Sequence, residues 1–128
     1  MLNSMSEIKI VIVDDEPEIL KTLKRILEKK DYVVSIYENP VEALNFLKSN
    51  PVDLVITDLK MPEMDGILFL MSVKEFYPSV PIILITGYAT IATAVTAIQK
   101  GAYDYIRKPF DVQKIYGVVE QALASAGH

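Results

Sequence analysis

The chain alternates between short apolar runs and longer segments whose apolar residues recur with helical spacing. The runs are Lys9–Val13, Val33–Tyr37, Val52–Thr57, Val80–Ile85 and Tyr103–Ile106. They are short and mostly rich in valine and isoleucine, which is typical of strands buried in a sheet. Strands that alternate with helices pair in parallel, so the pattern predicts an α/β fold. We expect a doubly wound, five-stranded parallel sheet with five helices and the flavodoxin-like order 2-1-3-4-5.

Helix boundaries are marked by residues with known positional preferences. Asn39-Pro40 and Asp111 are expected to begin the second and last helices, and Gly101 to end the fourth. Each helix should bury one apolar stripe. The expected inward-facing residues are Ile19, Leu20, Leu23, Ile26 and Leu27 in the first helix, Val41, Leu44 and Leu47 in the second, Ile67, Leu70, Met71 and Val73 in the third, Ile91, Ala94, Val95 and Ile98 in the fourth, and Ile115, Val118, Val119, Ala122 and Leu123 in the last.

Composition and charge narrow the class of protein. The 128 residues are 51% hydrophobic and 23% charged with a net charge of -4, so we expect one domain over residues 5–124, with tails at 1–4 and 125–128. No cysteine is present, which excludes thiol nucleophiles and zinc–thiolate sites, and the only histidine is His128. The acidic balance argues against direct nucleic-acid binding. No apolar run approaches the roughly 18 residues of a membrane span and no signal peptide is visible, so we expect a cytoplasmic protein.

Polar residues follow the C-terminal ends of four of the predicted strands. Asp14 and Asp15 follow the first, Asp58 the third, Thr86 the fourth and Lys108 the fifth. In a parallel sheet these ends share one edge, where open α/β folds bind their ligands. The sequence therefore predicts one crevice containing three carboxylates, a hydroxyl and an ammonium.

The charges in this crevice indicate its chemistry. Two carboxylates about 4 Å apart repel by roughly 4 kcal/mol at an effective dielectric of about 20. Three carboxylates with one lysine remain net negative, so we expect that either their pKa values rise or a cation binds. Oxygen ligands without histidine or cysteine favour Mg²⁺ or Mn²⁺. Such a site is suited to phosphoryl transfer, in which Asp58 attacks phosphorus to give an aspartyl-phosphate. Lys108 and Thr86 would then stabilise the phosphoryl oxygens.

Taken together, these residues resemble a response-regulator receiver domain of two-component signalling. The resemblance covers Glu7 to Ala124. It is carried by Asp14-Asp15, by Asp58 with Met61-Pro62 and Asp65-Gly66, by Thr86-Gly87, and by Lys108-Pro109-Phe110.

The resemblance implies a CheY-like fold, a set of site residues and a set of partners. Mg²⁺ would be held by Asp15, Asp58 and the backbone carbonyl of Lys60, with Asp14 acting mostly through water. Lys108 would contact the phosphoryl group, and the Lys108–Pro109 bond would be cis. Thr86 and Tyr105 would form the switch. A sensor histidine kinase would donate the phosphoryl group. An output domain, a partner protein or a phosphorylation-dependent homodimer would receive the signal, so the domain would be no enzyme beyond its own phosphorylation and dephosphorylation.

The run from Gly87 to Phe110 is most similar to receivers of NtrC-like regulators, which implies a transcriptional output; receivers with other outputs carry similar runs. Lys60 and Tyr88 occupy positions where receivers with fast self-hydrolysis tend to carry amide or acidic groups. Long or bulky side chains there should impede the attacking water, so we predict a persistent phosphoryl group.

Three other classes of protein fit these residues less well. A phosphatase of the haloacid-dehalogenase type needs a second Asp two residues after the nucleophile, where this chain has Lys60. A flavodoxin-type cofactor binder needs a hydroxyl- or Gly-rich loop after the first strand, where this chain has Asp14-Asp15-Glu16; no GxxxxGK loop is present either. A receiver that only binds would lack a site residue, and none is missing.

Overall fold

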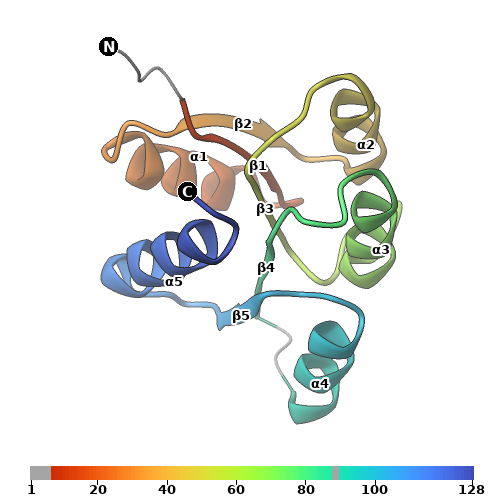
Figure 1. The fold of residues 1–128 in the computed structure, drawn as a ribbon. Coiled ribbons are helices and arrows are strands. Elements are labelled where there is room, and N and C mark those ends of the chain that lie inside the picture. The colour runs from red at the N-terminus through yellow and green to blue at the C-terminus, as the bar shows by residue number, and fades with distance from the viewer. Residues whose placement is uncertain (1–6, 88–89) are drawn as a thin grey trace.

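A computed structural model describes residues 7–87 and 90–128, and the order of its elements is the predicted alternation of strands and helices (Figure 1). The tail predicted at residues 1–4 lies outside the described residues. The elements are β1 (Lys9–Val13), α1 (Pro17–Glu28), β2 (Val33–Tyr37), α2 (Pro40–Ser49), β3 (Leu54–Thr57), α3 (Gly66–Phe76), β4 (Ile82–Thr86), α4 (Ile91–Gln99), β5 (Asp104–Arg107) and α5 (Val112–Ser125).

The strands form one parallel sheet in the order β2-β1-β3-β4-β5, which confirms the predicted topology. β1 and β3 pair with Val13 beside Thr57, and β4 and β5 pair with Thr86 beside Arg107. Asp14, Asp58 and Lys108 each follow directly after one of these strand ends. The register therefore brings three polar side chains that are far apart in the sequence to one edge of the sheet.

The sheet separates two apolar cores. α1 and α5 cover one face, and α2, α3 and α4 cover the other (Figure 1). Along β1, Ile10 and Ile12 face the first core, while Val11 and Val13 face the second. Burial on both faces explains why the strand is apolar at every position after Lys9. Each of these buried side chains contributes about 1.5–3 kcal/mol to the free energy of unfolding.

The predicted helix boundaries match local hydrogen bonds. The Asn39 side chain accepts from the amide of Val41, and Asp111 accepts from the amide of Gln113. Gly101 ends α4 with a φ of 113°, a left-handed conformation that favours glycine. Asp65 caps α3 by accepting from the amide of Leu68 at 2.9 Å, so this side chain has a structural role at the start of the helix.

Three of the predicted helix faces need correction. Val41 in α2 and Met71 in α3 are exposed, and the buried positions there include Ala43 and Phe69. The largest error is in α4, whose only buried residue is Ala97. Ile91 is 86% exposed, Val95 and Ile98 are about half exposed, and Ala94 is half-buried. A periodic apolar stripe cannot by itself distinguish a face that packs in the core from one that faces a partner. The faces of α1 and α5 are largely as predicted, although Ile19 is only half-buried.

Among the described residues, no helix has both the length and the apolar character needed to cross a bilayer.

Candidate functional site

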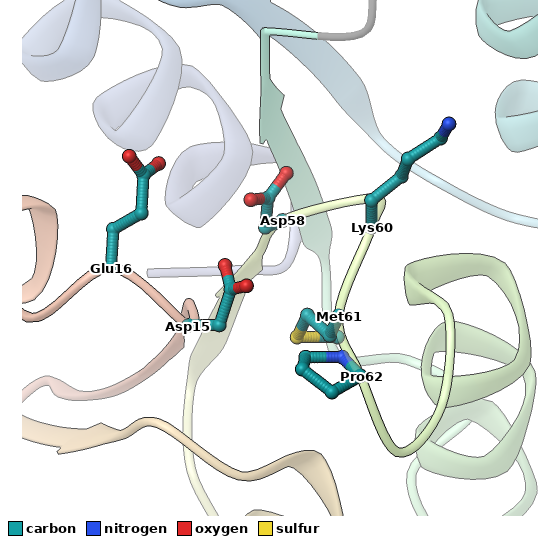
Figure 2. Close-up of a pocket in the computed structure, with 6 residues that line it drawn as sticks. All are labelled: Asp15, Glu16, Asp58, Lys60, Met61 and Pro62. Atoms are coloured by element: carbon teal, nitrogen blue, oxygen red, sulfur yellow. The ribbon is translucent and has the colours of Figure 1, made fainter.

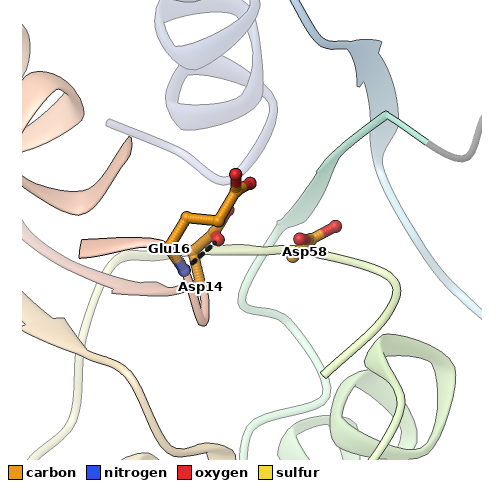
Figure 3. Close-up of side chains that lie close together, drawn as sticks. All are labelled: Asp14, Glu16 and Asp58. Carbon is orange, nitrogen blue, oxygen red and sulfur yellow. Dashed lines mark hydrogen bonds between the residues drawn. The ribbon is translucent and has the colours of Figure 1, made fainter. Parts of the chain in front are cut away.

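Lys108 is the centre of the polar cluster at this sheet edge. Its Nζ lies 2.8 Å from Asp14 Oδ2 and 3.2 Å from Asp58 Oδ2. It also lies 2.7 Å from Oε1 of Glu16 in the β1–α1 loop. The carboxylates of Asp14, Glu16 and Asp58 come from two separate chain segments and lie close together (Figure 3). The predicted convergence of the strand ends is therefore present for Asp14, Asp58 and Lys108.

Sequence reasoning missed the contact made by Glu16. From the sequence, Glu16 is expected only as part of the acidic Asp14-Asp15-Glu16 loop, and no contact with the fifth strand is predicted for it. Its side chain instead reaches Lys108, which is 92 positions away in the sequence. One signal in the sequence could have indicated this contact. Glu16 follows directly after Asp14 and Asp15, and the first and fifth strands end at the same edge of the sheet.

A pocket of about 470 Å³ opens beside Asp58. It is lined by Asp15, Glu16, Asp58, Lys60, Met61 and Pro62 (Figure 2). Asp15 is exposed at the pocket and does not contact Lys108 in the way that Asp14 does. The Lys60 side chain extends away from Asp15 and Glu16. Tyr88, which was paired with Lys60 in the prediction on phosphoryl lifetime, lies outside the described residues.

The backbone holds Asp58 in place. Its amide donates to the carbonyl of Val13 at 3.0 Å, and its Oδ1 accepts from the amide of Leu59 at 2.7 Å. The hydroxyl of Thr57 donates to the Asp58 carbonyl at 3.0 Å. Asp58 is buried, yet it lines the pocket, so a ligand that enters this space can reach it.

Gly66 is required by a close approach of the backbone to this same residue. A Cβ built at Gly66 would overlap the carbonyl oxygen of Asp58 and lie 2.8 Å from the Cα of Leu59. The chain between Asp58 and α3 therefore closes back on the site, and this close approach requires glycine at position 66.

The electrostatic balance of the cluster is negative. Burial raises the pKa of the Asp14 carboxyl from its ordinary 3.8 to about 6, and the charge of Asp58 adds to this rise, while hydrogen bonds from Lys108 and the Glu16 amide oppose it. Burial alone would lower the pKa of Lys108. Its hydrogen bonds to Asp14 and Glu16, and the charges of Asp14 and Asp58, outweigh that effect and hold the pKa above its usual range. Lys108 is therefore a permanent cation facing three carboxylates.

The donor set fits a hard divalent cation. One carboxylate oxygen from each of Asp14, Glu16 and Asp58 lies within 4.8 Å of the other two, and Asp15 adds a fourth carboxylate at the pocket. All of these donors are oxygen, which suits Mg²⁺ or Mn²⁺ rather than Zn²⁺.

Thr86 and Tyr105 lie on the same face of the sheet. Tyr105 is in register with Leu84, two residues before Thr86, and packs in the core under α4. Thr86 is buried, and its carbonyl accepts from the amide of Lys108 at 2.9 Å. Tyr105 also lines a surface pocket with Ile91 and Ala94 of α4. The Lys108–Pro109 peptide bond is cis, as the resemblance implied.

Comparisons with known proteins agree with this geometry. A family model described as a response regulator receiver domain matches residues 10–120. A putative NtrX-like response regulator of Rickettsia bellii is 42% identical over 92% of this chain and 25% of its own length. The DNA-binding transcriptional regulator NtrC of Escherichia coli strain K12 is 36% identical over 88% of this chain and 24% of its own length. The chain thus spans about a quarter of the curated relatives it matches.

Solved structures show the same fold. A CheY-like receiver domain protein of Methanospirillum hungatei JF-1 superimposes with a TM-score of 0.91 at 31% identity, covering 94% of this chain and 97% of the other. The beryllofluoride-activated NtrC4 receiver domain dimer gives a TM-score of 0.89 at 34% identity, with 93% and 98% of the two chains covered. The chain therefore belongs to the response regulator receiver domain family of two-component signalling, a signalling module rather than a classical enzyme.

Proposed function

We propose that Asp58 is the phosphoacceptor of this receiver and that a sensor histidine kinase is its donor. The observation that carries the proposal is the position of Asp58: its carboxylate lines the pocket and lies 3.2 Å from the Lys108 ammonium. A carboxylate held in this way is both a nucleophile and the neighbour of a positive charge that can receive phosphoryl oxygens.

The reaction is a displacement at phosphorus. An oxygen of the Asp58 carboxylate forms a bond to phosphorus while the P–N bond of the donor phosphohistidine breaks. The electron pair of that bond stays on the imidazole nitrogen, which takes up a proton, and Asp58 becomes an acyl phosphate. Lys108 and the hydroxyl of Thr86 donate hydrogen bonds to the transferred phosphoryl oxygens.

Asp14, Asp15, Asp58 and the backbone carbonyl of Lys60 would hold Mg²⁺ or Mn²⁺, with Asp14 acting mostly through water. When bound, the ion neutralises negative charge on the transferred group and on the carboxylates. The three side chains and the carbonyl supply only oxygen donors, in agreement with the fit described above.

The readout of phosphorylation is a shift in a two-state equilibrium. Thr86 moves toward the phosphoryl group, and Tyr105, on the same sheet face, follows into the space that it leaves. Because Tyr105 also lines the pocket with Ile91 and Ala94, its movement changes the surface of α4.

A second copy of this chain is the proposed partner of that surface. Ile91, Val95 and Ile98, here called the α4 surface, are large apolar side chains that face solvent. Exposed apolar groups gathered on one helix are typical of a protein interface. The similar NtrC4 receiver is a dimer in its beryllofluoride-activated form. The matched regulators are about four times longer than this chain, so we further propose a transcriptional output domain in the same polypeptide, in a cytoplasmic protein.

The test is to incubate the protein with Mg²⁺ and acetyl phosphate and to measure its intact mass. Asp58 should gain one phosphoryl group as acetate leaves, and Asp58→Asn should gain none. A phosphatase of the haloacid-dehalogenase type would instead release inorganic phosphate over many turnovers. No mass gain in the wild type, or an equal gain in Asp58→Asn, would sink the proposal.

A further inference from the structure

The Lys108 ammonium is saturated with carboxylate partners. It has three N–H donors, and three carboxylates lie within 3.2 Å of its nitrogen: those of Glu16, Asp14 and Asp58. A phosphoryl group on Asp58 requires at least one of these donors. Phosphorylation of Asp58 therefore brings further acceptors to an ammonium whose three donors are occupied, and the most weakly held of the three carboxylates is the one expected to yield.

Asp14 and Asp58 are held too firmly to be the group that yields. Both are buried at strand ends, and each accepts a second hydrogen bond from a backbone amide, from Glu16 at 2.9 Å and from Leu59 at 2.7 Å respectively. Their carboxylates can leave Lys108 only with movement of the sheet edge or the loop after it.

Glu16 is held differently. Its side chain is 59% exposed, although it makes the shortest of the three contacts with Lys108. Its backbone is fixed by the hydrogen bond to Asp14, so the side chain can rotate into water while α1 stays in place. The entropy cost of ordering a long side chain offsets most of the gain from an exposed ion pair, so the contact is released at little cost.

The position of Glu16 at the start of α1 also indicates that its side chain serves Lys108 rather than the helix. It is the N-cap residue of that helix, where a side chain usually accepts a hydrogen bond from the first turn. Glu16 makes no such bond. The carboxylate that could cap the helix is directed to Lys108 instead.

We propose that Glu16 is a positioning residue for phosphoryl transfer. Its carboxylate occupies the Lys108 donor that the phosphoryl oxygens take over, and it swings out when Asp58 is phosphorylated. This inference rests on the proposed function of Asp58. Glu16 keeps Lys108 extended toward the site in the unphosphorylated protein and, as a competitor for the same donor, slows phosphorylation.

Two substitutions separate the reach of Glu16 from its charge. Glu16→Gln keeps the length of the side chain and removes the charge, whereas Glu16→Asp keeps the charge and is too short to reach Lys108 from the N-cap. Glu18→Gln is the matched control, because Glu18 is an exposed acidic residue in the same first turn and has no contact with Lys108. All three variants should have the far-ultraviolet circular dichroism of the wild type.

The first readout is the rate of phosphorylation by acetyl phosphate with Mg²⁺, followed by intact mass. Glu16→Gln and Glu16→Asp should each be faster than the wild type by roughly two- to fivefold, the range expected for loss of one exposed ion pair. Glu18→Gln should match the wild type.

The second readout is independent of phosphorylation. The ¹H–¹⁵N signal of the Lys108 ammonium, assigned by its loss in Lys108→Arg, should shift in both Glu16 variants without phosphodonor and remain in place in Glu18→Gln. An unchanged signal in both Glu16 variants would show that Glu16 does not hold Lys108 and would overturn the inference.

The kinetic outcomes are also distinct. If the wild type takes up no phosphoryl group, the proposed function fails. If it does and both Glu16 variants react at the wild-type rate, only the present inference fails. A faster Glu16→Gln with an unchanged Glu16→Asp would assign the effect to charge alone and would likewise overturn the positioning role.

Discussion

The amide nitrogen of Gly66 lies 2.6 Å from the carbonyl oxygen of Leu59, which closes the loop that follows Asp58. The same approach leaves no room for a side chain at position 66, because a Cβ there would overlap the carbonyl of Asp58. The first residue of α3 is therefore packed against the backbone of the proposed phosphoacceptor.

We predict that Gly66→Ala destabilises the protein and disturbs the site. Overpacking against rigid backbone costs about 1–3 kcal/mol, and here the displaced atoms belong to Asp58 and Leu59. Urea unfolding measures the free energy, and acetyl phosphate labelling measures the site. Gly117→Ala is the control, since a Cβ in the middle of α5 meets no atom within 4 Å and should stabilise by about 0.5–1 kcal/mol. Equal stabilities of wild type and Gly66→Ala would contradict the close approach.

The stability of the metal-free protein should depend on the protonation of Asp14. Its pKa is about 6 in the folded state and near its ordinary 3.8 when unfolded. A raised folded pKa means that the contribution to stability is complete below about pH 4 and is lost as the pH rises through 6. At neutral pH the free energy of unfolding should therefore be lower by up to about 3 kcal/mol than it is below pH 4.

The measurement for Asp14 is urea unfolding of wild type and Asp14→Asn in EDTA between pH 4.5 and 7.5. The amide imitates the protonated carboxyl, so the variant should gain stability relative to the wild type as the pH rises. A difference that stays constant over this range would show that Asp14 has the same pKa in both states.

Replacement of Lys108 should be costly in the absence of metal. Lys108→Met leaves the buried carboxylates of Asp14 and Asp58 without their cation, a change that typically costs about 3–5 kcal/mol. The loss should be smaller near pH 5, where Asp14 is protonated. Thermal unfolding of Lys108→Met, Asp14→Asn and the double variant forms a cycle in which Asp14→Asn recovers part of the loss. Additive effects would mean that the two side chains are independent.

Charge on the α4 surface should prevent self-association. Sedimentation velocity with beryllofluoride and Mg²⁺ should show dimers of the wild type and monomers of Val95→Glu. Because Val95 is about half exposed, its substitution should change the stability of the monomer by no more than about 0.5 kcal/mol. Leu68→Glu, at an equally exposed apolar position on α3, should still dimerise. Dimers of Val95→Glu as strong as those of the wild type would exclude this surface.

The phosphoryl group on Asp58 should persist for minutes or longer at room temperature. Lys60 lines the pocket beside Asp58, and a lysine cannot orient an attacking water as an amide can. Lys60→Asn should therefore shorten the lifetime several-fold in a mass-spectrometric time course. Loss of the label from the wild type within seconds would refute the prediction.

Local pattern was sufficient for most of the fold. Strand positions, caps such as Asn39 and Asp111, and the sheet order follow from periodicity, turn chemistry and the rules of βα connection. The pattern was not sufficient for α4, because Ile91, Val95 and Ile98 have the spacing of a core stripe but face solvent. Ala97 is the buried residue of α4, and a periodic pattern does not show which of several apolar residues faces the sheet.

The site was predictable to the extent that strand ends define it. Asp14, Asp58 and Lys108 follow strands that the register places side by side, so their contact follows from topology. Glu16 and Gly66 depend on side-chain reach and on loop closure, which no local pattern encodes. The roles of Thr86 and Tyr105, the metal ligands and the cytoplasmic location stay predictions.

The weak attachment of α4 has a consequence for how such a domain can change partners. α5 buries five residues in the core, whereas α4 buries one. Substitutions at Ile91, Val95 or Ile98 therefore alter the outward surface at little cost to folding. Such substitutions would change the partner that the proposed α4 interface recognises, while the sheet and the proposed phosphorylation site stay the same.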